Sequence, residues 1–194
     1  LIDKDLAYIS KEVPKEEGER GEVIRFRNPN KKIKFDDKIL DQIEVDTKDL
    51  GDFVIAKDLE TPLYHFVVVI DDFEMRVTHV IRGQEHIANT PRQILIQEAI
   101  GAPRPIYAHI PLILAPDKTK LSKRHGSVSV NEYMEQGYLP EAIINFLAML
   151  GWSPQAGESG TEKEIFSMEE LIELFDLGNV QKSPAIFNIE KLNW

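Results

Sequence analysis

Short stretches in the first third of the chain alternate apolar and polar residues, which is the pattern of half-buried strands. "EVIRFR" and "KIKFDD" alternate in this way on either side of "NPNK", and together they predict a β-hairpin. "IEVD" and "DFVIAKD" predict two further strands. Before them, residues 1–9 indicate the tail of a helix, and the polar residues 11–22 indicate a loop. We therefore expect a small β-rich unit in this part of the chain.

The middle of the chain predicts a βαβ unit. "VTHVIRG" is typical of a strand that ends at Gly83, and "IYAHIPLILA" is typical of a second, buried strand. Between them, Thr90 is expected to cap a helix through a capping box with Gln93, and Gly101 is expected to end that helix. Parallel sheets bind ligands at the carboxyl ends of their strands. The turn "IRGQEH" and the loop "DKTKLSKRHG" each follow a strand, so we expect both to face one crevice.

Two other regions complete the pattern. In residues 63–72, "LYHFVVVIDD", the β-branched residues favour a buried strand, although a buried helix has the same apolar pattern. After residue 127 the pattern becomes helical, with expected helices in "SVNEYMEQGY", "LPEAIINFLAMLGW" and "SMEELIELF". Ser167 and Glu170 predict a capping box at the start of the last of these.

The composition is that of an ordinary globular protein, and it excludes several kinds of site. Hydrophobic residues make up 42% of the 194 residues and charged residues 29%. The sequence has no cysteine, which excludes disulfides, thiol nucleophiles and cysteine-based zinc sites. No pair among the five histidines has the spacing of a helical metal motif. No apolar run approaches the roughly 20 residues that span a bilayer, so we expect no membrane partner.

The charge is distributed unevenly along the chain. The formal net charge is −10, yet residues 76–130 carry 8 basic and 3 acidic side chains. Residues 1–75 carry 12 and 19, and residues 131–194 carry 3 and 11. A local basic segment of this kind suits a polyanionic ligand, although a solvated face without a partner has the same composition.

Four cations within seven residues mark one loop of this basic segment, namely Lys118, Lys120, Lys123 and Arg124. Their spacing matches neither a P-loop nor a GxGxxG turn. Lysines on a flexible loop can close over phosphate oxygens, because each ammonium group is a mobile point charge. The loop therefore predicts a phosphate ligand, and a surface loop of solvated lysines is the alternative.

"KLSKR" in this loop is similar to the second signature of class I aminoacyl-tRNA synthetases, which has the general form Lys-Met-Ser-Lys-Ser. The stretch from "HVIRGQEHIANTPRQ" to "KTKLSKRHGSVSV" resembles the bacterial glutamyl-tRNA synthetases. The likeness continues through "EYMEQGYLPEAIINFLAMLGW" to "IEKLNW", and "VIRFRNP" and "YHFVVVIDD" match upstream. The resemblance thus covers nearly the whole chain.

The resemblance implies an α/β fold, namely the second half of a Rossmann-type class I synthetase catalytic domain. A small β-rich connective unit comes before it and a helical stem-contact region after it. We expect residues 1–60 to form part of the connective unit, which binds the tRNA acceptor end. Residues 61–116 would form the second half of the nucleotide-binding fold, and residues 117–194 the signature loop and the helical stem-contact domain. The first, histidine-containing signature of the class is absent from this sequence, so we expect this stretch alone not to activate glutamate.

The same resemblance implies an activity and a set of ATP-binding residues. The family joins glutamate to ATP as glutamyl-adenylate and then moves glutamate to the 3′ end of its tRNA. The signature lysine that contacts ATP corresponds to Lys123, with Lys120 assisting it, so both are candidate catalytic residues. Ser122 and Glu85 are further candidates for ATP binding. The physical reason is that cations placed in advance stabilise the negative charge that develops on departing pyrophosphate.

Three residues are expected to bind glutamate. Arg82 corresponds to the arginine that reads the side-chain carboxylate of the amino acid, which a guanidinium can hold through two hydrogen bonds. Tyr64 corresponds to a tyrosine that contacts the amino acid. Glu85 corresponds to an acidic position near the amino group and the adenylate. Structural alternatives exist for each: a salt bridge for Arg82, core packing for Tyr64, and a solvated turn for Glu85.

The resemblance also implies ligands and partners. We expect ATP with Mg²⁺ as a substrate, the ion being bound mainly by the phosphates. The zinc hairpin of some family members would precede "VIRF", where this sequence is short and lacks cysteine, so we expect no structural zinc. The expected partners are tRNA, ATP and L-glutamate, and we expect a monomer in the cytoplasm.

Two other functions are compatible with the sequence. One is that of a paralogue of the glutamyl-queuosine type, which charges glutamate onto a modified tRNA base and ends soon after the signature loop. The residues from Gly126 onward match the longer enzyme instead. The other is that of a non-catalytic tRNA-binding module.

Overall fold

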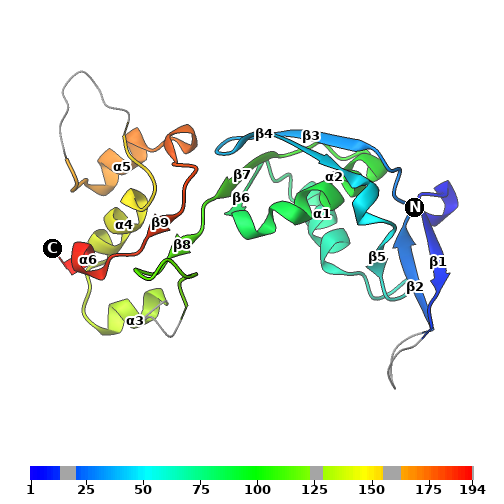
Figure 1. The fold of residues 1–194 in the computed structure, drawn as a ribbon, viewed down its shortest axis with the longest axis horizontal. Coiled ribbons are helices and arrows are strands. Elements are labelled where there is room, and N and C mark those ends of the chain that lie inside the picture. Colours follow the sequence, from blue (N-terminus) through cyan, green and yellow to red (C-terminus); the bar gives the residue numbers. More distant parts are fainter. Residues whose placement is uncertain (14–20, 123–128, 155–162, 194) are drawn as a thin grey trace. The chain divides into compact units, whose positions relative to one another are not determined.

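A computed structural model describes residues 1–13, 21–122, 129–154 and 163–193 of the chain (Figure 1). It divides into two compact units. The first unit contains residues 1–81 and 86–107, and the second contains residues 82–85 and 108–194. Two adjacent strands, β6 (His79–Gly83) and β7 (Ile106–Ile110), begin in the first unit and end in the second.

The first unit contains the predicted β-rich region, but its strands pair differently from the prediction. A three-stranded antiparallel sheet has the order β1 (Ala7–Lys11), β2 (Glu22–Phe26), β5 (Phe53–Ala56). A second sheet has the order β4 (Asp41–Asp46), β3 (Lys32–Asp37), β7, β6, in which β3 and β4 form an antiparallel hairpin. The predicted hairpin of β2 with β3 is therefore wrong, because these strands belong to different sheets.

Asn28 explains why the "NPNK" segment links two sheets instead of closing a hairpin. The Asn28 side chain is 5% exposed, and its Nδ2 donates to the Thr47 carbonyl at 2.6 Å. Its backbone N–H donates to Asp52 Oδ1 at 2.8 Å. Both partners are distant in sequence, so local turn signals could not reveal them.

The predicted helix over residues 1–9 is also wrong. Only a single 3₁₀ turn forms, η1 (Ile2–Lys4), and it ends at Asp5 in the left-handed conformation with φ 55°. The chain then enters β1, which pairs with β2 along its whole length from Ala7 to Lys11. Pairing with a partner strand thus decides the conformation of a stretch whose local pattern favoured a helix.

The stretch 63–72 is helical from Tyr64 onward and does not form the strand that its β-branched residues favoured. Helix α1 (Tyr64–Glu74) packs against α2 (Thr90–Ile100) and against β5. Figure 1 shows the two helices next to each other. Val69 is buried in the same core as Ile94 and Ile96 of α2 and the aromatic residues of the two sheets. Packing of this kind overrides the weak preference of valine for strands.

The predicted order of strand, helix and strand is confirmed as β6, a 3₁₀ helix η3 (Gln84–Asn89), α2 and β7, with β6 next to β7 in the sheet. Strand β7 runs parallel to β3.

Two details of this unit differ from the prediction. Helix α2 includes Thr90 as its first residue, because η3 leads directly into it and Asn89 takes the cap position. The predicted second strand ends at Ile110, before Pro111, and resumes as β8 (Ile113–Leu114), which pairs with β9 (Ala185–Ile186).

The second unit is mainly helical, as predicted. Its described helices are α3 (Val130–Glu135), α4 (Pro140–Met149), α5 (Met168–Leu174), η5 (Leu177–Asn179) and α6 (Ile189–Asn193). The capping box of α5 is confirmed, with reciprocal hydrogen bonds between Ser167 and Glu170. Within the described residues, no helix has the length and apolar character needed to cross a bilayer.

Candidate active site

Arg82 is the penultimate residue of β6. A buried histidine of β7 contacts its guanidinium. Arg82 Nε donates a hydrogen bond to His109 Nε2 at 3.2 Å. His109 has 0% exposure, whereas Arg82 is half-buried. Arginine has only donors, so the Nε2 atom of His109 must be the acceptor. The arginine expected to bind glutamate therefore donates a hydrogen bond to a buried side chain of the neighbouring strand.

Glu85 follows Arg82 on the turn that leaves the sheet. Its carboxylate folds back over the backbone at Gly83, since a Cβ at that glycine would stand 2.2 Å from Glu85 Oε2. Any other residue at position 83 would push the carboxylate away. Gly83 therefore gives Glu85 its position in the turn.

Lys120 projects from a tight hairpin that begins at β8. The Ala115 N–H donates to the Thr119 carbonyl and the Leu121 N–H donates to the Ile113 carbonyl, at 2.8 and 3.1 Å. Lys118 has φ 63°, which suits the left-handed position after a type I turn. Asp117 Oδ1 accepts from both the backbone and the hydroxyl of Thr119. This turn places the first lysine of the "KLSKR" signature at an antiparallel β-bridge with Leu114.

The hairpin and the β6 turn meet through one ion pair. Lys120 Nζ lies 3.8 Å from Glu85 Oε1, with the two side chains 66% and 42% exposed. An exposed pair of this kind contributes little to stability. The ion pair agrees with the expectation that these two segments face each other. The ammonium group of Lys120 remains accessible to a ligand.

The remaining predicted site residues are Ser122, Lys123 and Tyr64. Ser122 is half-buried at the end of the hairpin. Lys123, the expected ATP contact, lies outside the described residues. Tyr64 is the first residue of α1, is 55% exposed, and its ring centroid lies 5.3 Å from that of His65. Tyr64 belongs to the first compact unit and the other residues to the second.

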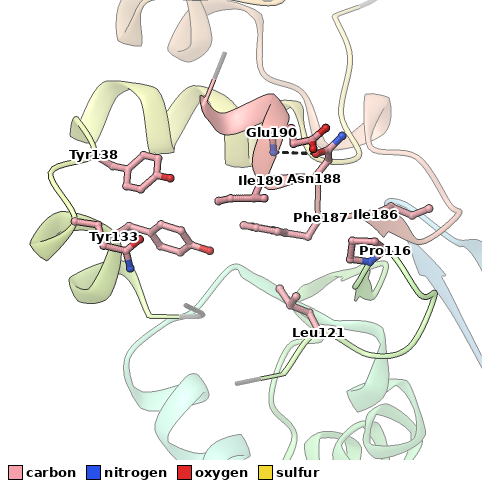
Figure 2. Close-up of a pocket in the computed structure, with 10 residues that line it drawn as sticks. Pro116, Leu121, Tyr133, Tyr138, Ile186, Phe187, Asn188, Ile189 and Glu190 are labelled. Carbon is pink, nitrogen blue, oxygen red and sulfur yellow. Dashed lines mark hydrogen bonds between the residues drawn. The ribbon is translucent and has the colours of Figure 1, made fainter. Parts of the chain in front are cut away.

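A pocket of about 630 Å³ is lined in part by residues of the same hairpin (Figure 2). Pro116 and Leu121 contribute the hairpin side, and the rings of Tyr133, Tyr138 and Phe187 form an aromatic wall. The polar groups at its rim come from Gln136, Asn188 and Glu190. The lining residues come from segments far apart in the sequence, so no motif indicated this pocket.

Sequence reasoning also missed His109, although a signal was present. It stands inside "IYAHIPLILA", where every other position but one proline is apolar or aromatic. A histidine in a buried strand needs a partner, and Arg82 on the neighbouring strand supplies one. No group of three or more metal-binding side chains gathers in the part of the chain that the structure describes.

Comparison with known proteins decides the family. The profile of the class I tRNA synthetases (E and Q), catalytic domain, matches residues 2–194. The chain belongs to this family. Among curated relatives, glutamate–tRNA ligase of Aquifex aeolicus is 57% identical over 172 residues, and that of Carboxydothermus hydrogenoformans is 54% identical over 176 residues. These alignments cover 88% and 90% of this chain and 36% of each relative.

Solved structures of this class I family agree with the fold. Glutamate–tRNA synthetase of Elizabethkingia anophelis superposes with a TM-score of 0.79 at 42% identity, covering 89% of this chain and 38% of that one. A glutamate–tRNA ligase of Elizabethkingia meningosepticum, in complex with its amino acid, has the same TM-score at 43% identity, covering 89% and 37%. The chain thus spans a little over a third of the relatives that it matches.

Proposed function

We propose that this chain supplies the glutamate- and ATP-binding half of an enzyme that ligates glutamate to tRNA. Its relatives are named glutamate–tRNA ligases at 48–57% identity. The observation that carries the proposal is the group of Arg82, Glu85 and Lys120 at the end of β6 and on the hairpin. Arg82 can bind a carboxylate, and Lys120 can bind a phosphate. In this proposal residues 1–60 receive the tRNA acceptor end, residues 61–116 form the catalytic half-fold, and residues 117–194 hold the signature loop and contact the stem.

Arg82 accounts for selection of glutamate in this proposal. A guanidinium pairs with a carboxylate through two charge-assisted hydrogen bonds, which the amide of glutamine cannot reproduce. The half-buried position of Arg82 strengthens such a pair compared with one in bulk water. Tyr64 and Glu85 are the proposed further contacts to the amino acid.

Lys120 and Lys123 account for activation. A carboxylate oxygen of glutamate attacks the α-phosphorus of ATP, and the bond from that phosphorus to pyrophosphate breaks. Negative charge grows on the departing pyrophosphate, where the two ammonium groups and the Mg²⁺ that accompanies ATP stabilise it. Lys120 is exposed on a hairpin closed by backbone hydrogen bonds, which supports this role. The proposal includes action as a cytoplasmic monomer, which gel filtration and cell fractionation would check.

The test is glutamate-dependent exchange of pyrophosphate into ATP, with tRNA present, by the full-length protein that carries this sequence. We expect Lys120→Ala to lower kcat by roughly a hundredfold, because it removes a cation that acts mainly in the transition state. We expect Arg82→Ala to raise the KM for glutamate by at least about tenfold while the KM for ATP changes little.

Lys182→Ala, in the second unit but outside this group, is the matched control for removing a lysine. A full-length protein that binds tRNA but shows no exchange would contradict the proposal and favour a non-catalytic tRNA-binding module. Charging of a modified tRNA base in place of the acceptor end would favour the glutamyl-queuosine type of enzyme.

A further inference from the structure

We propose that His109 is a positioning residue for substrate selection, which acts as a neutral acceptor that aims the Arg82 guanidinium. This inference rests on the proposed function, since it assigns the means by which Arg82 reads a carboxylate. His109 lies on β7 and Arg82 on β6, which are neighbours in one sheet. The two side chains meet at 3.2 Å through Arg82 Nε and His109 Nε2.

The protonation state of His109 follows from the chemistry of its partner. Arginine donates through all its nitrogens and remains charged at any ordinary pH. His109 Nε2 therefore keeps its lone pair, and the ring hydrogen is on Nδ1. Protonating the ring would break this hydrogen bond. It would also place a second positive charge beside the guanidinium, on a side chain that is 0% exposed. The geometry thus requires a neutral imidazole.

A neutral acceptor has an advantage over an acidic one at this position. Carboxylates are the commoner partners of half-buried arginines, but a carboxylate at position 109 would neutralise Arg82 and compete with the substrate for it. An imidazole fixes the guanidinium without cancelling its charge. The imidazole itself therefore adds no negative charge that would compete with a substrate carboxylate for Arg82.

The hydrogen bond to His109 also determines which nitrogens of Arg82 would bind a ligand. Because Nε donates to His109, we expect a substrate carboxylate that pairs with Arg82 to accept from its terminal nitrogens. Misplacement of these nitrogens by about 1 Å weakens binding strongly, since both hydrogen bonds depend on one plane. His109 does not touch the substrate in this arrangement, and its effect passes through Arg82.

Three substitutions in the full-length protein separate the parts of this inference. His109→Leu removes the acceptor, His109→Gln retains a neutral acceptor through its amide oxygen, and His109→Glu retains an acceptor but adds a negative charge. His79→Leu, at an exposed histidine on the same strand as Arg82, is the matched control. The measurements are kcat, the KM values for glutamate and ATP in pyrophosphate exchange, and thermal unfolding of each variant.

We expect the KM for glutamate to rise about tenfold in His109→Leu, with kcat and the KM for ATP changed by less than about threefold. His109→Gln should restore the KM for glutamate to within about threefold of the original protein. His109→Glu should raise it at least as much as His109→Leu. If His109→Leu does not fold, the KM values of His109→Gln and His109→Glu test the inference instead. Both variants retain an acceptor for Arg82, and only His109→Glu adds a negative charge beside it.

Three results overturn the inference alone, with the original protein active and Arg82→Ala impaired in glutamate binding. One is an unchanged KM for glutamate in His109→Leu. Another is a loss of kcat and of thermal stability without a change in that KM, which is the mark of a purely structural histidine. The third is a normal KM in His109→Glu. An original protein without any exchange activity instead overturns the proposed function, and the inference with it.

Discussion

Glu44 shows how two cations on one strand act on a single carboxylate of the next strand. Lys32 and Lys34 of β3 lie two residues apart, so both side chains are on one face of the sheet. Their Nζ atoms lie 2.6 and 2.9 Å from the two oxygens of Glu44 on β4. The hydrogen bond from Lys32 is the main cause, with that from Lys34 next, of a pKa of about 2 for Glu44, against 4.5 ordinarily.

This depressed pKa predicts the sign of a pH effect on stability. The folded protein holds Glu44 ionised more strongly than the unfolded chain, so the contribution is complete above the unfolded pKa near 4.5 and is lost as the pH falls through the folded pKa of about 2. We expect Glu44→Gln to lower the free energy of unfolding at pH 7, and this difference to shrink to a small remainder as the pH falls to about 2. Urea denaturation across this range measures the difference.

Salt is the control for the electrostatic origin of this difference. The side chains of Glu44, Lys32 and Lys34 are 37%, 66% and 60% exposed, so salt at about 1 M should reduce the difference at pH 7. A difference between the two proteins that stays constant from pH 7 to pH 2 would show that the lysines do not act through the charge of Glu44.

At the scale of elements, helix α2 depends on the residue that ends it. Gly101 has φ 74°, and its N–H donates to the Gln97 and Glu98 carbonyls. The left-handed conformation costs an L-residue roughly 1–2 kcal/mol, whereas glycine adopts it readily. The chain then turns through Ala102, whose N–H donates to the Gln97 carbonyl at 2.9 Å, and proceeds to β7.

We expect Gly101→Ala to lower the free energy of unfolding by about 1 kcal/mol. A Cβ at Gly101 would meet no atom within 4 Å, so the loss is conformational and not steric. Gly21→Ala is the matched control, because a Cβ there also meets no described atom within 4 Å and no left-handed conformation is required. Chemical denaturation of both variants is the measurement, and equal stabilities would refute the conformational account.

At the scale of the whole molecule, the arrangement of the two sheets depends on a buried polar side chain. Asn28 lies between β2 of one sheet and β3 of the other, and its hydrogen bonds reach the Thr47 carbonyl and the Asp52 carboxylate. Its own Oδ1 accepts from the Asn30 N–H at 3.0 Å. These bonds stabilise the link between the sheets, because a buried polar group left without a partner is costly.

We expect Asn28→Ala to lower the free energy of unfolding by roughly 1–3 kcal/mol, since it leaves the buried Thr47 carbonyl without the Asn28 donor. Asn30→Gly is the control, because Asn30 is exposed at φ 51° and contributes only its backbone N–H to this network. Denaturation followed by circular dichroism measures both. A loss in Asn30→Gly as large as that in Asn28→Ala would assign the effect to the backbone turn.

The sequence by itself determined the features that depend on neighbouring residues. The capping box at Ser167, the glycine end of α2 and the helical periods after residue 127 were predicted because each is a contact within a few residues of the chain. Strand β6 and the turn after it, which contains Glu85, were also predicted from neighbouring residues. The family resemblance, which added the roles expected of Arg82 and Lys120, also depends only on the order of residues.

The tertiary structure alone decided the features that depend on distant partners. Strand β2 pairs with β1 and β5 instead of β3, and residues 64–74 are helical, because pairing and packing partners far along the chain outweigh local preference. The same holds for the contact of His109 with Arg82 and that of Lys120 with Glu85. Each joins side chains at least 27 residues apart, and only folding brings such atoms within hydrogen-bonding or ion-pairing distance.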